Sequence, residues 1–144
     1  MRVHCGMARA GLVAVAGVLV FGCSGGDDGS GPSPTATTIA VASGSVQTGT
    51  VGSTLPTPIG ARVTDAGGDP VAGVAVTFAV TAGDGAVAAA APVTTNAQGE
   101  ASTTWTIGTV AGVNNNVATA TAAGLSGSPV TFRASGNAGA PAAV

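Results

Sequence analysis

The sequence predicts an all-β protein built as an antiparallel sandwich of about seven or more short strands. Large apolar residues alternate with small or polar ones along four segments, which is the period of a half-buried strand. Turn-forming residues separate these segments about every 8–14 residues, as in sandwiches. With 24 glycines, 7% charged residues and almost no Glu, Lys or Leu, the composition excludes a coiled coil.

The first 22 residues are typical of a secretory signal peptide. Residues 1–9 carry Arg2 and Arg9 and no acid, and residues 10–22 are uncharged and almost wholly apolar. Thirteen residues of helix reach about 20 Å, which is short of the ~30 Å hydrocarbon core. We therefore expect export rather than a permanent membrane span. Translation from Met7 instead of Met1 would leave one positive charge in the leader, and both starts stay open.

The segment Val20-Phe21-Gly22-Cys23 resembles the bacterial lipobox, in which a small residue precedes a cysteine that is lipidated and becomes the first mature residue. The resemblance implies that Cys23 carries a diacylglycerol on its thiol and a third acyl chain on its amine, and two or more chains anchor stably. Ser24 is similar to the outer-membrane sorting pattern of double-membraned bacteria. The alternative is an ordinary signal peptide whose cleavage leaves Cys23 as a spare thiol.

Four regions follow from this pattern. Residues 24–38 contain no large apolar side chain up to Thr38, so this stretch does not bury enough surface to order itself. Fully extended, such a tether spans at most about 50 Å. The expected organisation is a signal peptide over 1–22, lipidated Cys23 with a disordered linker over 23–38, one domain over 39–136, and a disordered tail over 137–144.

The clearest strand runs through residues 74–80, where Val74, Val76, Phe78 and Val80 share one face. Similar alternation covers 59–64, 101–107 and 130–135, with weaker runs over 38–42, 45–51, 92–95 and 116–123. Turns are expected at 66–70, 83–85, 96–99, 112–116 and 124–127. The side chains expected in the core are Ile39, Val41, Ile59, Val63, Val74, Val76, Phe78, Val80, Trp105, Ile107, Val117, Val130 and Phe132.

One run of residues resembles a known module. Asp65-Ala66-Gly67-Gly68-Asp69-Pro70-Val71-Ala72-Gly73-Val74-Ala75-Val76-Thr77-Phe78 is followed by Thr95, Gly99 and Trp105-Thr106-Ile107-Gly108. Over about residues 40–136 this is similar to the group 1 bacterial immunoglobulin-like (Big-1) domain of the invasin and intimin adhesins. The resemblance implies an immunoglobulin-like antiparallel β-sandwich and suggests cell adhesion. Those adhesins carry tandem copies and a separate recognition domain, whereas one copy is found here, so adhesion does not carry over with the fold.

Elementary chemistry explains the turn in that run. The Asp65 carboxylate can cap the turn after its strand, and Gly67 and Gly68 permit positive φ. Pro70 then fixes the start of the next segment.

Catalysis is not expected, and no catalytic residue is assigned. Once the leader is removed with His4 and Cys5, the chain has no His, no Lys and no free thiol to act as a base or nucleophile. Arg62 and Arg133 oppose six carboxylates in that exported part, which gives a net charge of −4. An acidic body of this kind disfavours nucleic acid, and we expect no cofactor and no small-molecule substrate.

Three aspartates are the only candidate metal ligands in or near turns. Asp65, Asp69 and Asp84 could converge at one end of the sandwich to hold Ca²⁺ or to act as an acid and base pair. Because Asp is also a good turn residue and no dense acidic loop is present, we expect no metal site. Whether the three converge is left open by the sequence.

Other polar residues have simple interpretations. Asn114, Asn115 and Asn116 are expected to form a polar loop tip that solvates a hairpin, with sugar or partner binding as the alternative. Arg62, Arg133 and Glu100 are expected at solvated strand positions, where an ion pair contributes at most about 1 kcal/mol. Trp105 is expected inside the sandwich rather than as a sugar platform.

These observations predict a non-catalytic, lipid-anchored lipoprotein of the bacterial envelope, at the outer membrane, that displays one immunoglobulin-like domain with a structural, adhesion or interaction role. Its partner would be the membrane through the lipid, together with an unidentified protein or glycan. The alternatives are a carbohydrate- or calcium-binding module that uses its end loops, and an accessory subunit of an envelope or secretion assembly that pairs through an edge strand.

Overall fold

The structure, a computed structural model, describes residues 33–141 and is all-β, as the alternation predicts. The predictions for residues 1–32, including the signal peptide and lipidation of Cys23, lie outside the described residues. The strands are β1 (Thr38–Ser43), β2 (Val46–Thr50), β3 (Ile59–Thr64), β4 (Ala75–Ala82), β5 (Ala86–Val87), β6 (Val93–Thr94), β7 (Glu100–Thr103), β8 (Trp105–Thr106), β9 (Gly112–Thr121) and β10 (Val130–Asn137).

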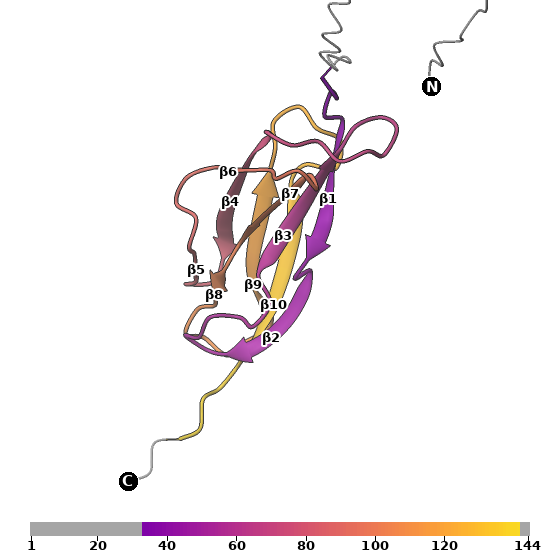
Figure 1. Cartoon of the computed structure of the whole chain (residues 1–144). Helices are drawn as coiled ribbons and strands as arrows, with labels where there is room; N and C mark the ends of the chain where they lie inside the picture. Colours follow the sequence, from indigo (N-terminus) through magenta and orange to yellow (C-terminus); the bar gives the residue numbers. More distant parts are fainter. Residues whose placement is uncertain (1–32, 142–144) are drawn as a thin grey trace, which may run out of the picture. The chain divides into compact units, whose positions relative to one another are not determined.

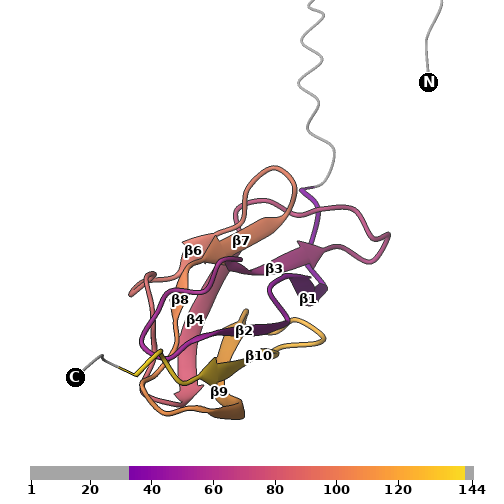
Figure 2. The ribbon, with the colours of Figure 1, turned by 90° about the horizontal axis from the view of Figure 1, so that it is seen from below.

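Two sheets form the layers of an immunoglobulin-like sandwich. One has the order β1-β3-β7 and the other β2-β10-β9-β4-β6, while β5 and β8 form a short separate ladder. Figure 2, seen from below, shows β3 and β7 in one layer and β9 and β10 in the other. Between named strands the pairing is antiparallel except for β2, which runs parallel to β10. The sandwich prediction is therefore confirmed.

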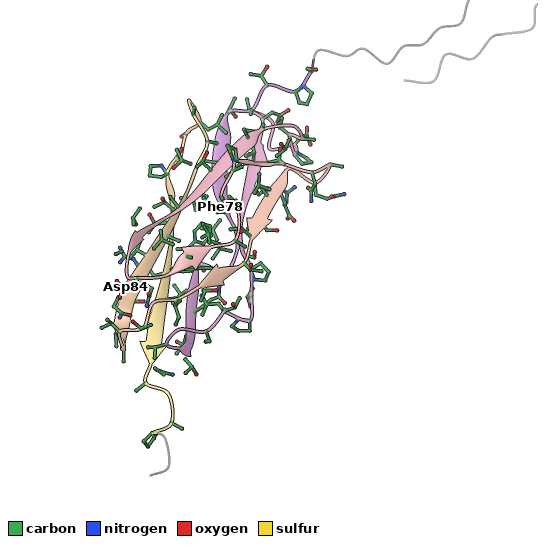
Figure 3. All side chains as sticks on the ribbon, turned by 90° about the vertical axis from the view of Figure 1, so that its left-hand side faces the viewer. Phe78 and Asp84 are labelled. Carbon is green, nitrogen blue, oxygen red and sulfur yellow. The ribbon has the colours of Figure 1, made fainter. Side chains whose placement is uncertain are left out.

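The core lies between the two layers and contains most of the expected side chains. Phe78 lies in the interior in Figure 3 and is 4% exposed. The other expected residues that are buried are Ile39, Ile59, Val63, Val76, Trp105, Ile107, Val130 and Phe132. Because each large side chain contributes about 1.5–3 kcal/mol when fully buried, this cluster is the main source of stability.

Four expected core positions were wrong or only partly right. Val117 is partly exposed because it lies opposite Arg133 on the outer face, so its neighbour Ala118 points inward instead. Val41 is 42% exposed beside the irregular end of β1. Val74 and Val80 are only partly buried, although both pack against the core.

Small residues on the central strand β9 make room for the aromatic rings. Ala118 lies opposite Phe132 on one side, and Ala120 lies opposite Phe78 on the other. Both alanines are fully buried. An interior of fixed thickness accepts large side chains on neighbouring strands only where the strand between them is small, which is why the valine lies outside and the alanines inside.

Two core residues lie outside every predicted strand and were not expected in the core. Leu55 is 3% exposed and Val71 is 4% exposed, although neither belongs to a named strand. Leu55 is fixed by its backbone N–H, which donates to Trp105 O at 2.8 Å. The expected strand over 101–107 is divided into β7 and β8, and the short strand β5 was not predicted.

The segment from Thr38 to Thr50 passes from one sheet to the other. β1 pairs with β3, and after a turn at Gly44, whose φ is +70°, β2 joins the opposite sheet beside β10. The Gln47 side chain secures this crossing, because its Nε2 donates to Thr57 O at 2.8 Å and its Oε1 accepts from Thr57 N at 3.2 Å. One segment is thereby fixed to both layers.

The chain enters and leaves the sandwich at opposite ends. β1, β2 and β10 run in the same direction, so Thr38 lies at one end and Asn137 at the other (Figure 1). We call these the N-terminal end, with loops 65–73, 95–99 and 122–129, and the C-terminal end, with loops 51–53, 83–85 and 107–111. At about 3.3 Å per residue, the ten residues of β9, the longest strand, make the sandwich roughly 30 Å long.

Candidate functional site

The turn after β3 is held together by the Asp65 carboxylate. Its Oδ1 accepts from Gly67 N at 2.8 Å and from Asp69 N at 3.0 Å, and Asp65 N donates to Asp69 O at 2.9 Å. Gly68 adopts a φ of +91°, whereas no positive φ occurs at Gly67. The predicted capping role of Asp65 is confirmed, and one of its two oxygens is already engaged by its own turn.

A buried threonine ties the same loop to its neighbour. Thr95 is 4% exposed, and its Oγ1 donates to Val71 O at 2.8 Å while accepting from Val74 N at 2.9 Å. The hydroxyl therefore satisfies two backbone groups that no strand partner reaches. This contact explains why a threonine precedes the turn at 96–99, and it is structural.

The Asn96 side chain shapes that adjacent turn. Its Oδ1 accepts from Gln98 N at 2.9 Å and from Glu100 N at 3.0 Å, and Gly99 N donates to Asn96 O. Glu100 then opens β7 as an exposed residue opposite Arg62 of β3, as expected for solvated strand charges. Arg133 is likewise exposed on β10.

The three candidate metal ligands do not converge. Asp65 and Asp69 belong to the loop that precedes β4, whereas Asp84 follows β4 and lies near the margin of the molecule in Figure 3. The eight residues of β4 separate these positions by roughly 25 Å. Within residues 33–141, no group of three or more His, Cys, Asp or Glu side chains could hold a metal ion.

The three asparagines are not a loop tip, which corrects the prediction for residues 112–116. They lie within β9, where the register with β10 shifts between Ala134 and Gly136 and Asn114 adopts a φ of +50°. This is a bulge, in which unpaired backbone groups must find other partners. Asn114 N finds one in Ser135 Oγ at 3.0 Å.

Side-chain amides supply the partners that the bulge lacks. Asn115 Nδ2 donates to Val110 O at 2.6 Å, and Asn115 Oδ1 accepts from Gly136 N at 3.4 Å. Asn116 is only 1% exposed, and its Oδ1 accepts from Gly108 N at 2.8 Å. The side chains of Asn115 and Asn116 thus hold the bulge, whereas Asn114 is exposed and contributes its backbone N–H. Asn116 is too deeply buried to contact a sugar.

Gly108, the glycine that follows Trp105 by three residues, is required by close packing. A Cβ at Gly108 would lie 2.6 Å from Asp84 N and 3.2 Å from Asn116 Oδ1. The turn at 83–85 and the start of β9 therefore meet at this glycine. The spacing between tryptophan and glycine in the sequence reflects this contact at the C-terminal end.

Trp105 lies at the centre of the core, as expected. Its side chain is completely buried, and its indole Nε1 has no hydrogen-bond partner among the described residues. A buried ring has no face to offer a sugar, so a platform role is excluded by geometry. The unpaired indole N–H lowers the net gain from burying this side chain.

Two of the three most exposed large apolar side chains lie near the C-terminal end, whereas the third, Val46, lies opposite Arg133 about midway along β10. Val113 is 84% exposed at the start of β9, and Val110 is 63% exposed in the preceding loop. Val46, at the start of β2, is 70% exposed. No pocket opens on the part of the chain that the structure describes, and no helix within it is long and apolar enough to cross a membrane. The described surface therefore offers loops and strand edges rather than a cleft.

No protein-family model matches the sequence, and no curated protein matches it either. Among solved structures, the chain is similar to domains 4–9 of the surface layer protein SbsC, with 21% identity over 77% of this chain and 15% of that chain, and a TM-score of 0.49. It is also similar to the Escherichia coli adhesin FdeC, with 18% identity over 73% of this chain and 32% of that chain, and a TM-score of 0.47. The chain thus spans under a third of either structure, and its immunoglobulin-like topology rests on its own strand order.

Proposed function

We propose that this chain is a non-catalytic, lipid-anchored envelope protein that presents a single immunoglobulin-like domain of the Big-1 type for a structural or adhesive interaction. The observation that carries the proposal is the lipobox-like segment ending at Cys23, followed after a polar stretch by a sandwich that the chain crosses from one end to the other. An anchor on the N-terminal side would leave the C-terminal end as the presented surface.

The anchor is supported by the chemistry of the leader. The leader has the features that export and acylation require: a positively charged N-terminal region, an apolar run over residues 10–22, and a small residue, Gly22, before Cys23. Two or more acyl chains would hold the protein at a membrane stably, whereas one would not. Ser24 beside the cysteine favours the outer membrane as the destination.

The presented surface would be the C-terminal end of the sandwich. Val110 and Val113 expose most of their apolar surface there, and Asp84 is the one charged side chain of its loops. Loops positioned by a rigid scaffold are the usual place for binding residues. A linker that reaches up to about 50 Å and a sandwich of roughly 30 Å would together carry this end well clear of a membrane face.

A non-catalytic role is supported by the residue types of the sequence and by the hydrogen bonds of the described residues. The only His of the chain is His4, in the leader, and the sequence has no Lys. The Asp65 carboxylate is engaged by its own turn, and the amides of Asn115 and Asn116 serve the bulge. The polar groups that are placed most firmly are thus occupied in holding the fold.

Metabolic labelling with a fatty-acid analogue tests the proposal. The wild-type chain should acquire label and fractionate with membranes, and Cys23→Ser should abolish both. Cys5→Ser is the matched control, because it removes the other cysteine and should leave labelling unchanged. Protease applied to intact cells would then report whether the domain faces outward. Equal labelling of wild type and Cys23→Ser, or no label on either, would overturn the lipid anchor.

A further inference from the structure

β2, the second strand of the described domain, and β10, its last strand, form the only parallel ladder between named strands. Within residues 33–141, β2 and β10 pair from Val46 opposite Arg133 to Thr50 opposite Asn137. Backbone hydrogen bonds close the ladder at both ends, from Arg133 N to Ser45 O and from Val51 N to Asn137 O, each at 2.9 Å. The remaining named strands pair antiparallel, so this ladder has a mechanical property that the others do not share.

Tension along the chain would load this ladder in shear. The chain enters at the N-terminal end and leaves at the C-terminal end (Figure 1), so pulling on both sides draws β2 and β10 in opposite directions along their own axes. Because the inter-strand bonds of a parallel ladder are spread along its length, all of them resist this motion at once. In a ladder opened from one end, the bonds would instead break one after another.

Neighbouring contacts prevent the ladder from sliding freely. At its start, Gln47 fixes β2 to the backbone of Thr57. At its end, Gly52 N donates to Gly108 O at 3.0 Å, and Gly136 lies against the Val51 side chain. Upstream, β1 is paired with β3 in the opposite sheet. Pulled from the N-terminal side, the segment must therefore detach from both layers.

We propose that the β2–β10 ladder is a force-bearing clamp, and that the domain transmits tension between a membrane anchor and whatever is held beyond its C-terminal end. This inference rests on the proposed function, because tension requires a fixed point on the N-terminal side. Resistance to force depends on the rate of forced unfolding rather than on equilibrium stability. Strong resistance to pulling therefore does not require a high free energy of unfolding in urea.

Single-molecule force spectroscopy on the full chain tests the clamp through two attachment geometries. Both geometries carry Cys5→Ser and Cys23→Ser, which removes the lipidated thiol, and Val144→Cys provides one handle. In the shear geometry, Thr35→Cys, at an exposed position before β1, provides the other. In the opening geometry, Thr50→Cys replaces Thr35→Cys, so that force acts on the same ends of β2 and β10, where Thr50 lies opposite Asn137. We expect the rupture force to be severalfold higher in the shear geometry. Equal forces in the two geometries would overturn the proposal.

A pair of proline variants locates the resistance. Arg133→Pro removes the N–H that donates to Ser45 O, whereas Thr131→Pro removes an N–H on the same side of β10, two residues before the first pair of the ladder. In the shear geometry, Arg133→Pro should lower the rupture force severalfold and Thr131→Pro should not. Equal losses in both variants would contradict the clamp. Should Arg133→Pro fail to fold by circular dichroism, the two attachment geometries, which leave the ladder intact, still decide.

The force experiment and the labelling experiment test the clamp and the lipid anchor independently. Force spectroscopy uses the purified chain and needs no lipid, so a shear-resistant domain that acquires no fatty acid would refute the anchor alone. Conversely, a labelled protein that ruptures equally in both geometries would refute the clamp alone.

Discussion

The side-chain oxygen of Asn116 accepts a hydrogen bond from the backbone N–H of Gly108 at 2.8 Å, and this contact joins the bulged strand β9 to the loop that follows Trp105. Asn116 is 1% exposed, so neither group has water as an alternative partner. The residue that the sequence assigns to a solvated loop is thus one of the most buried polar groups of the protein.

Asn116→Ala should therefore destabilise the domain by about 1–3 kcal/mol, because it leaves a buried N–H unpaired. Urea unfolding followed by circular dichroism would measure the change in the free energy of unfolding. Asn114→Gly is the control, since Asn114 is exposed and already adopts the positive φ that glycine prefers. A loss for Asn114→Gly as large as that for Asn116→Ala would refute the assignment.

Thr95 provides a test of a single buried hydroxyl. Thr95→Val keeps the shape but removes the oxygen that bonds Val71 O and Val74 N, so we expect a loss of about 1–3 kcal/mol. Thr95→Ser retains the hydroxyl, so its free energy of unfolding should fall clearly less. The same urea titrations would compare the two variants, and a more stable valine variant would show that the hydroxyl does not bridge the loops.

Trp105 should be the most costly core residue to truncate. Trp105→Ala is expected to lose about 3–5 kcal/mol, because it opens a large cavity between the sheets. Trp105→Phe should lose much less stability, because the indole N–H that it removes makes no hydrogen bond with the described residues. Thermal melts by circular dichroism would rank the three proteins, and an alanine variant that melts within a degree or two of wild type would contradict the core.

Alanine variants of two glycines distinguish the cost of a left-handed backbone from the cost of a steric clash. Gly99 and Gly124 have φ values of +72° and +75°, but a Cβ at Gly99 would lie 2.5 Å from Val63 O, whereas a Cβ at Gly124 would meet nothing within 4 Å. Gly124→Ala should lose about 1–2 kcal/mol through the left-handed conformation alone. Gly99→Ala should lower the free energy of unfolding substantially more, as measured in urea. Equal losses would show that the backbone at Val63 and at residues 70–71 moves aside freely.

Metal should not affect the domain. Because β4 separates Asp65 and Asp69 from Asp84, the carboxylates that could bind Ca²⁺ lie at opposite ends of the sandwich. The melting temperature should be the same in excess EDTA and in millimolar calcium. A rise of several degrees with calcium would reveal a site that the described residues do not assemble.

Local pattern alone was sufficient for much of the architecture. Strict alternation placed β3, β4 and β10 and most of their inward side chains, because a strand's two faces differ in burial from one residue to the next. The turn at Asp65 was also predictable, since its carboxylate bonds to backbone groups two and four residues away. Features of this kind depend only on residues that are close together in the sequence.

Only the tertiary structure decided the features that depend on distant partners. Asn116 is buried because Gly108 approaches it, Val117 faces outward because Arg133 lies opposite, and Leu55 is buried because Trp105 O holds its backbone. The parallel pairing of β2 with β10 likewise joins residues more than eighty positions apart. A one-dimensional pattern specifies which face of a strand is apolar, but the partner strand determines which face is inside.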